Sequence, residues 1–112
     1  MQDPSHFTAL KLIEAEPDIS QRELARRMGV SVGKANYCLR ALVTKGFVKL
    51  ENFRKSNKKM AYAYLLTPAG IEEKARLTLA FLRYKEAEYE RIKREIDELR
   101  AEAQRATTSS NN

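Results

Sequence analysis

The feature that most constrains the fold is a pair of helix-start signals on either side of a single glycine. Ser20 is followed three positions later by Glu23, the capping-box pattern in which each side chain can satisfy the other's backbone N–H. Gly29 stands where a left-handed residue would end the first helix, and Ser31 is placed to cap the next one. The pattern predicts a helix, a tight turn and a second helix over about residues 20–44.

The flanking sequence predicts a mainly α chain with one small β-hairpin. Apolar residues recur at helical spacing over residues 5–16 until a proline stops them. Residues 47–53 and 60–66 are β-branched, aromatic and partly alternating, and the basic sequence RKSNKK separates them, so we expect a hairpin with a basic tip. Thr67-Pro68-Ala69-Gly70 then supplies a cap and a first-turn proline for a further helix.

The second helix of the pair, from about residue 32, divides into two faces. Its apolar residues fall at i, i+4, i+7 and i+8, which predicts a buried stripe of Ala35, Leu39, Leu42 and Val43. The opposite face carries small residues and hydrogen-bond donors without a carboxylate: Val32, Gly33, Lys34, Asn36, Tyr37 and Arg40. This face is the first candidate for a contact with a ligand.

The positive charge is concentrated in the middle of the chain. The formal net charge is +6, but residues 1–25 carry a net charge of −3 and residues 61–112 carry nine charges of each sign. Residues 26–60 hold ten basic residues against Glu51 alone, a net charge of +9. One contiguous basic segment indicates a polyanionic partner, nucleic acid above all, with a merely solvated basic surface as the alternative.

Beyond Gly70 the chain contains no glycine or proline and becomes rich in Ala, Glu, Lys, Arg and Leu. Apolar residues repeat every seven positions, with others between them, so a heptad stripe follows a helix of more than thirty residues. The stripe comprises Leu82, Tyr89, Ile92, Ile96 and Leu99. A second copy of the chain could cover it, or the helix could fold back over its own domain. We expect the tail, residues 106–112, to be disordered.

The remaining chemistry-bearing residues give no support to an enzyme. Cys38 has no partner for an intramolecular disulfide and is expected to be a core thiol, with a redox switch as the lesser alternative. His6 is the single histidine and lacks the Cys or His partners of a zinc site. We find no glycine-rich phosphate loop, membrane span or signal peptide, and therefore expect a cytoplasmic protein without a cofactor.

Two stretches of the sequence resemble the MarR superfamily of winged helix-turn-helix regulators. They are ISQRELARRMGVSVGKANYCLRALVTKGFVKLENF and YLLTPAGIEEKARLTLAFL. The sequence is most similar to the branch of exopolysaccharide-associated transcriptional regulators. The resemblance implies a bacterial DNA-binding homodimer that acts near exopolysaccharide or capsule genes and associates with the nucleoid when bound. It implies a winged helix-turn-helix domain at residues 4–68 and a coiled-coil-like dimerisation helix at residues 69–105.

Two departures from the family pattern qualify what the resemblance implies. MarR-type wings usually carry an acid, a spacer and an arginine, whereas Lys58 and Met60 occupy these positions here. Typical members also begin with an additional helix, which we do not find. We therefore expect dimerisation to depend on the C-terminal helix, and a small-molecule effector is doubtful.

A recognition helix fits the major groove, and side chains from its N-terminal half reach base edges. Lys34 and Arg40 can bind guanine or phosphate, and Asn36 can match adenine. We expect further phosphate contacts from the start of the preceding helix, Ser20, Gln21 and Arg22. The wing would add Arg54, Lys55, Lys58 and Lys59. The alternative function is a winged-helix module that binds RNA or another protein.

Overall fold

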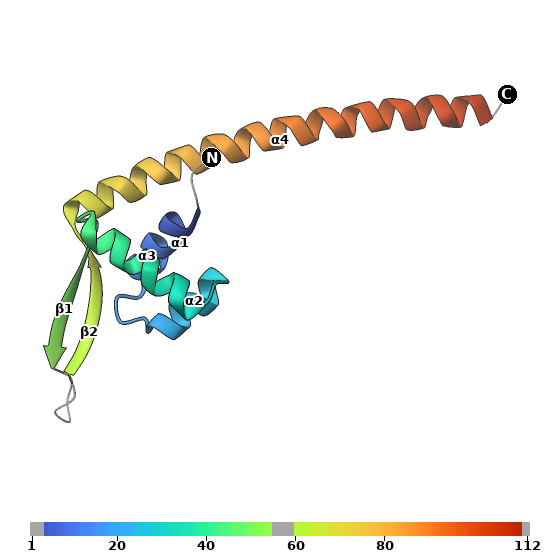
Figure 1. Cartoon of the computed structure of the whole chain (residues 1–112). Coiled ribbons are helices and arrows are strands. Elements are labelled where there is room, and N and C mark those ends of the chain that lie inside the picture. Colours follow the sequence, from blue (N-terminus) through green and yellow to red (C-terminus); the bar gives the residue numbers. More distant parts are fainter. Residues whose placement is uncertain (1–3, 55–59, 111–112) are drawn as a thin grey trace. The chain divides into compact units, whose positions relative to one another are not determined.

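The computed structural model describes residues 4–54 and 60–110, with the backbone alone for residues 52–54, 60–62 and 110. The elements follow one another as four helices and one hairpin: α1 Pro4–Ala15, α2 Gln21–Met28, α3 Val32–Thr44, β1 Val48–Arg54, β2 Met60–Leu66 and α4 Pro68–Ser110. Figure 1 shows α1, α2 and α3 gathered together, with the hairpin beside α3. The predicted fold class, a winged helix-turn-helix followed by a long C-terminal helix, is confirmed.

The chain divides into two compact units, Met1–Thr78 and Leu79–Asn112. The first unit holds α1 to α3, the hairpin and the first turns of α4, so its boundary lies ten residues beyond the one predicted from the sequence. Leu77 is buried, which explains why these turns of α4 belong with the winged domain. The second unit is the rest of α4.

The core of the first unit is assembled from side chains of its helices and its hairpin. Its largest fully buried side chains are Leu10 and Ile13 of α1, Leu24 of α2, Leu42 of α3 and Val48 of β1. The buried residues of α3 are Ala35, Cys38, Leu39 and Leu42, so the predicted stripe is confirmed at three positions and Cys38 is a core thiol. Val43, expected in the stripe, is 43% exposed because it borders a groove between α3 and the hairpin.

The turn between α2 and α3 forms as the sequence predicts. Ser20 Oγ accepts from the backbone N–H of Glu23 at 3.1 Å, and Ser31 Oγ accepts from that of Lys34 at 3.1 Å. Gly29 adopts the left-handed conformation with φ of 71°, which only glycine reaches without a steric cost. The reciprocal half of the capping box does not form, because the Glu23 carboxylate accepts from Arg26 and Arg27 instead.

The hairpin is an antiparallel pair that extends from Val48 opposite Leu66 to Arg54 opposite Met60. Strand β2 is attached to the helical part through its backbone, since Tyr64 N–H donates to the carbonyl of Pro17 at 2.9 Å. The hairpin base is attached through Thr67, whose N–H donates to the carbonyl of Phe47 at 3.0 Å. The first bond connects the hairpin to the segment between α1 and α2, and the second closes the base of the hairpin.

Helix α4 begins at a close backbone contact and ends later than predicted. Thr67 Oγ1 caps it by accepting from the N–H of Gly70 at 3.0 Å. The helix continues through Ser110, which includes most of the tail that the sequence predicts to be disordered. Because neither glycine nor proline follows Gly70, nothing in the sequence interrupts the backbone hydrogen bonds before the end of the chain.

Gly70→Ala is expected to destabilise the protein strongly. A Cβ at this position would overlap the carbonyl oxygen of Phe47, a backbone atom that cannot move without shifting the hairpin base. Overpacking of this kind costs about 1 to 3 kcal/mol. Gly33→Ala is the matched control, because its new Cβ would meet only the Ser31 hydroxyl at 3.9 Å and alanine favours the helix. Urea unfolding should show opposite shifts, and an unchanged Gly70→Ala midpoint would contradict the tight contact.

Candidate nucleic-acid interface

The N-terminal half of α3 presents an exposed face without acidic residues. Val32, Gly33, Lys34, Tyr37 and Arg40 are exposed, and Tyr37 has the largest exposed fraction, 76%, among the large hydrophobic side chains that the structure describes. The helix contains no Asp or Glu along its whole length. The five side-chain positions therefore lie on the face that the sequence predicts, opposite the buried stripe.

The cations near this face differ in whether an acid neutralises them. Arg27 forms salt bridges with Glu16 at 2.7 Å and Glu23 at 2.9 Å, and Arg26 pairs with Glu23. Hydrogen bonds from Arg26 and then Arg27 lower the pKa of Glu23 to about 2, so this carboxylate stays ionised at neutral pH. The positive charge at the C-terminal end of α2 is therefore largely compensated within the protein.

The remaining cations have no such compensation. Within the described residues, no salt bridge involves Arg22 at the start of α2 or Lys34 and Arg40 on α3. All three side chains are exposed. A polyanion that contacts these side chains would not have to displace an internal carboxylate, so they are available as electrostatic attachment points on this side of the domain.

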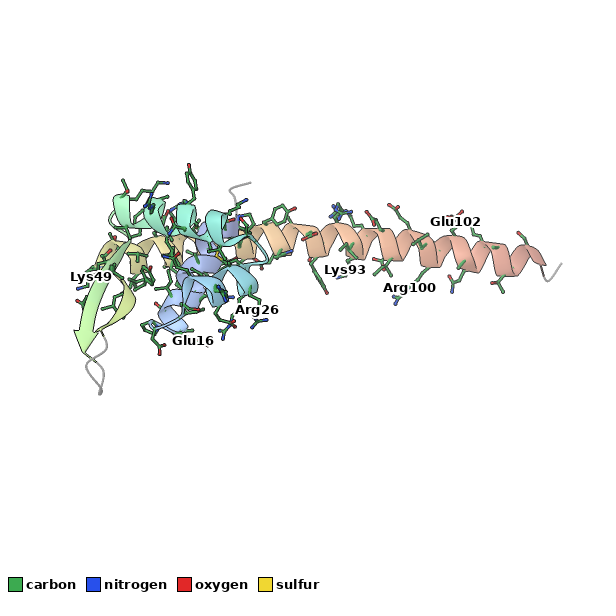
Figure 2. The ribbon with its side chains drawn as sticks, turned by 60° about the horizontal axis from the view of Figure 1, so that its bottom comes forward. Glu16, Arg26, Lys49, Lys93, Arg100 and Glu102 are labelled. Atoms are coloured by element: carbon green, nitrogen blue, oxygen red, sulfur yellow. The ribbon has the colours of Figure 1, made fainter. Side chains whose placement is uncertain are left out.

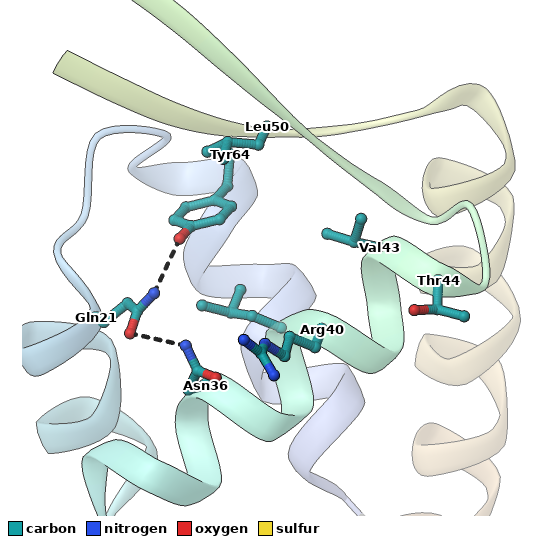
Figure 3. Close-up of a pocket in the computed structure, with 8 residues that line it drawn as sticks. Gln21, Asn36, Arg40, Val43, Thr44, Leu50 and Tyr64 are labelled. Atoms are coloured by element: carbon teal, nitrogen blue, oxygen red, sulfur yellow. Dashed lines mark hydrogen bonds between the residues drawn. The ribbon is translucent and has the colours of Figure 1, made fainter. Parts of the chain in front are cut away.

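Two of the predicted contact residues bind each other. Asn36 Nδ2 donates to Gln21 Oε1 at 3.1 Å, and Gln21 Nε2 donates to the Tyr64 hydroxyl at 3.2 Å (Figure 3). This chain of bonds connects α3, the start of α2 and strand β2. Asn36 is half-buried and keeps its Oδ1 and its second N–H for a further partner, since a side-chain amide has two donor hydrogens.

Sequence reasoning missed Tyr64, which holds the Gln21 amide from the hairpin side. Residue 64 is 43 positions from Gln21 in the chain, and the pairing depends on the fold, which brings β2 beside the start of α2. The hydroxyl of a tyrosine on a largely apolar strand was the available signal, because a half-buried tyrosine usually has a hydrogen-bond partner. Gln21 therefore holds the Asn36 amide of α3, and its predicted phosphate contact stays a prediction.

A groove of about 440 Å³ separates α3 from the hairpin. Gln21, Asn36 and Tyr64 form its polar end, and Figure 3 shows Val43, Thr44 and Leu50 along the rest. Arg40 lines the same groove and is exposed. The groove therefore borders the acid-free face of α3 directly.

The wing tip falls outside the described residues. Lys55, Lys58 and Lys59 lie in the segment between the two strands, and Arg54 ends β1 with only its backbone described. Lys49, lower on β1, pairs with Glu51 at 3.1 Å. The predicted phosphate contacts of the wing remain predictions.

The described residues hold no cluster of three or more His, Cys, Asp or Glu side chains that could bind a metal ion. Likewise, no helix among the described elements combines the length and apolar character that crossing a membrane requires. His6 is half-buried in α1, and Cys38 is buried in α3.

Comparison with known proteins shows similarity to DNA-binding proteins. Residues 2–49 match the family described as winged helix-turn-helix DNA-binding. No curated protein matches the chain. Among solved structures, a MarR family protein of Mycobacterium tuberculosis in complex with p-aminosalicylic acid is 27% identical and has a TM-score of 0.60, with 77% of this chain and 62% of that chain covered.

Two further structures are similar in fold. The PcaV transcriptional regulator of Streptomyces coelicolor is 21% identical with a TM-score of 0.62, covering 77% of this chain and 60% of that chain. Streptococcus pneumoniae FabT in complex with DNA is 20% identical with a TM-score of 0.53, covering 75% and 57%. This chain thus spans only 57–62% of the length of the three solved proteins.

The matched family is a DNA-binding one and the similar structures include regulators, which confirms the prediction that the chain is not an enzyme. The chain has the winged helix-turn-helix fold continued by a long C-terminal helix, and it is similar to the DNA-binding regulators of the MarR family.

Proposed function

We propose that the protein is a sequence-specific DNA-binding transcriptional regulator that acts as a homodimer. The observation that carries the proposal is the exposed, acid-free N-terminal half of α3, with Lys34 and Arg40 uncompensated by any described acid. A helix of this kind fits the major groove, where base edges differ in their pattern of donors and acceptors. The DNA-bound FabT supports the proposal as a protein of the same fold.

In this proposal some residues of α3 contact DNA bases and others contact the DNA phosphates. Lys34 and Arg40 bind guanine or phosphate, and Tyr37 packs on a thymine methyl or donates to a phosphate. Val32 and Gly33 permit close approach of the helix. Asn36 uses its remaining donor and acceptor for a base while Gln21 holds the amide. Ser20 and Arg22 place the N-terminus of α2 against a phosphate.

The dimer in this proposal is built by α4. The heptad residues Leu82, Tyr89, Ile92, Ile96 and Leu99 are 43–64% exposed in the single chain. A second copy would bury them and bring two recognition helices to one duplex. If the pair docks with two-fold symmetry, its operator is an inverted repeat with half-sites about 10 base pairs apart, one helical turn.

The proposal also covers the cellular setting. The protein acts in the bacterial cytoplasm and is associated with the nucleoid when bound. The resemblance found in the sequence favours exopolysaccharide or capsule genes as targets. We include no small-molecule effector.

A mobility-shift assay with DNA from upstream of the protein's own gene tests the proposal. We expect a complex that an excess of unrelated DNA or of RNA fails to displace, and that unlabelled upstream DNA does displace. Competition by RNA at equal or lower concentration would favour the RNA-binding alternative. Absence of any nucleic-acid complex at low salt would favour a protein-interaction module.

Neutralising the wing tip should weaken binding to all DNA sequences alike. Lys58→Gln combined with Lys59→Gln removes two expected phosphate contacts, and each contact contributes a slope of about 0.9 in log K against log salt concentration. Affinities measured from about 50 to 200 mM salt should therefore show a flatter dependence. Lys11→Gln with Arg105→Gln removes the same charge elsewhere and serves as control. A wing variant that changes base preference but keeps its salt slope would contradict a phosphate role.

A further inference from the structure

The exposed seam of α4 has charged flanks of unlike character. In the heptad frame, one series of seam positions holds Leu82, Tyr89, Ile96 and Ala103, and the other holds Lys85, Ile92, Leu99 and Ala106. The flank that precedes each residue of the first series carries Phe81, Glu88, Glu95 and Glu102. The opposite flank, which follows each residue of the second series, carries Glu86, Lys93 and Arg100. Figure 2 shows Lys93 and Arg100 extending from one side of the helix and Glu102 from the other.

These flanking charges are available for a partner. Within the described residues, Lys93, Arg100 and Glu102 form no salt bridge. Glu95 accepts from Arg91 through Oε1 at 2.6 Å, and no described residue bonds to its Oε2. From Glu88 onward, the helix thus carries an acidic edge and a basic edge on the two sides of one apolar seam.

We infer that the occupant of this seam is a second copy of the chain, paired as a parallel, in-register coiled coil. In a parallel pair, each residue of the flank that holds the glutamates faces the partner's opposite flank five positions further along the chain. Glu88 then faces the partner's Lys93, and Glu95 faces the partner's Arg100. Two-fold symmetry doubles both attractive pairs.

An antiparallel pair would bring like charges together. In that orientation each flank faces the same flank of the partner, so the edge whose charged residues are all glutamates faces its own copy. The flanking charges therefore select the parallel orientation. This inference rests on the dimer in the proposed function and adds its orientation and register.

Lys85 selects the register. It occupies a seam position and is paired with Glu88 of its own helix at 3.3 Å. With the two copies in register, the two lysines share one layer. A shift by one heptad would place one lysine opposite Ile92 and the other opposite Thr78, in separate layers, which doubles the number of layers that contain a lysine. In the in-register pair, both copies of Leu79 lie at the same end of the coiled coil, so both winged domains begin from that end.

Disulfide trapping tests orientation and register together. Leu82→Cys and Ala103→Cys are made separately in the full chain carrying Cys38→Ala, which removes the native thiol and keeps Lys85. A disulfide needs Cα atoms about 4.4 to 6.8 Å apart. Both variants should cross-link under mild oxidation. In an antiparallel pair, at least one of the two sites would lie about 32 Å or more from its counterpart, since the two residues are 21 positions apart and a helix rises about 1.5 Å per residue. Cross-linking at only one site, or at neither, would overturn the inference.

Charge reversal tests the flanking pairs. Glu88→Lys with Glu95→Lys should raise the dimer dissociation constant at least tenfold, because like charges then face each other. Adding Lys93→Glu and Arg100→Glu should restore it, since this fourfold variant recreates both attractive pairs with their signs exchanged. Glu90→Lys with Glu98→Lys makes the same charge change away from the seam. Because Lys93 and Arg94 lie one turn from Glu90, this control lowers the stability of the isolated helix at least as much. This control should leave the dimer intact.

Sedimentation equilibrium gives the dissociation constants. Failure of the fourfold variant to regain dimerisation, or equal loss in the control, would overturn the charge pairing. The mobility shift of the wild-type protein is measured alongside. Specific DNA binding without the expected cross-links would reject the orientation alone, whereas parallel dimers that bind no DNA would reject the regulator function alone.

Discussion

Arg40→Ala is expected to lower operator affinity by about 1 to 3 kcal/mol, the typical value of a bidentate contact with a base, without changing the Tm. The side chain is exposed on the face of α3 opposite the core, and no described acid pairs with it. Removing it therefore costs the fold no buried contact. Titrations of operator and scrambled DNA at one salt concentration give the loss of discrimination.

Asn36→Ala extends this prediction to the hydrogen-bonded chain on α3. We expect it to lose base discrimination as well, while its Gln21 partner loses an amide donor in a half-exposed position. Arg94→Ala, an exposed arginine of α4, serves as control for loss of charge alone. If both α3 variants bind the operator as tightly as the wild type, α3 is not the reading helix.

Ending the chain after Leu79 should convert the protein into a monomer with much weaker operator binding. The cut leaves the first compact unit whole, including the buried Leu77, and removes the heptad seam. Linking two binding modules raises the overall affinity by about 10²- to 10⁴-fold through effective concentration, so a loss of this size is expected. Weak, salt-sensitive binding should remain. Sedimentation and mobility shifts measure both effects.

A fusion provides the control for this truncation. Joining the shortened domain in heptad phase to an unrelated parallel two-stranded coiled coil should restore most of the lost affinity if α4 acts by pairing two domains. Undiminished operator binding by the truncated form would contradict the dimer account. So would a monomeric intact protein at micromolar concentration.

Local signals in the sequence were sufficient to predict the elements and the exposed face of α3. The caps at Ser20 and Ser31 and the left-handed Gly29 act within one turn of the chain, so their geometry follows from neighbouring residues. The helical period of Ala35, Leu39 and Leu42 fixes which side of α3 is buried. The remaining side of the helix is then exposed without further information.

What the sequence could not supply depends on contacts between distant elements. The bond from Gln21 to Tyr64 requires the packed hairpin, and the exposure of Val43 depends on the groove beside it. Arg27 was counted with the basic segment, but the chain folds so that Glu16 lies beside it. The Gly70 contact with Phe47 likewise joins two segments that only the fold brings together. The charge summed along the sequence therefore overestimates the positive charge of the surface. The fold is needed to identify which cations have no acidic partner.

Selection of bound fragments from a pool of random DNA is the most direct test of the central claim, that two copies of α3 read a defined sequence. Repeated rounds of binding and sequencing with the intact protein should enrich one inverted repeat whose half-sites lie about 10 base pairs apart. The Arg40→Ala variant should lose enrichment at specific positions within each half-site. A pool that shows no sequence enrichment, although the protein retains DNA at low salt, would contradict sequence-specific reading by α3.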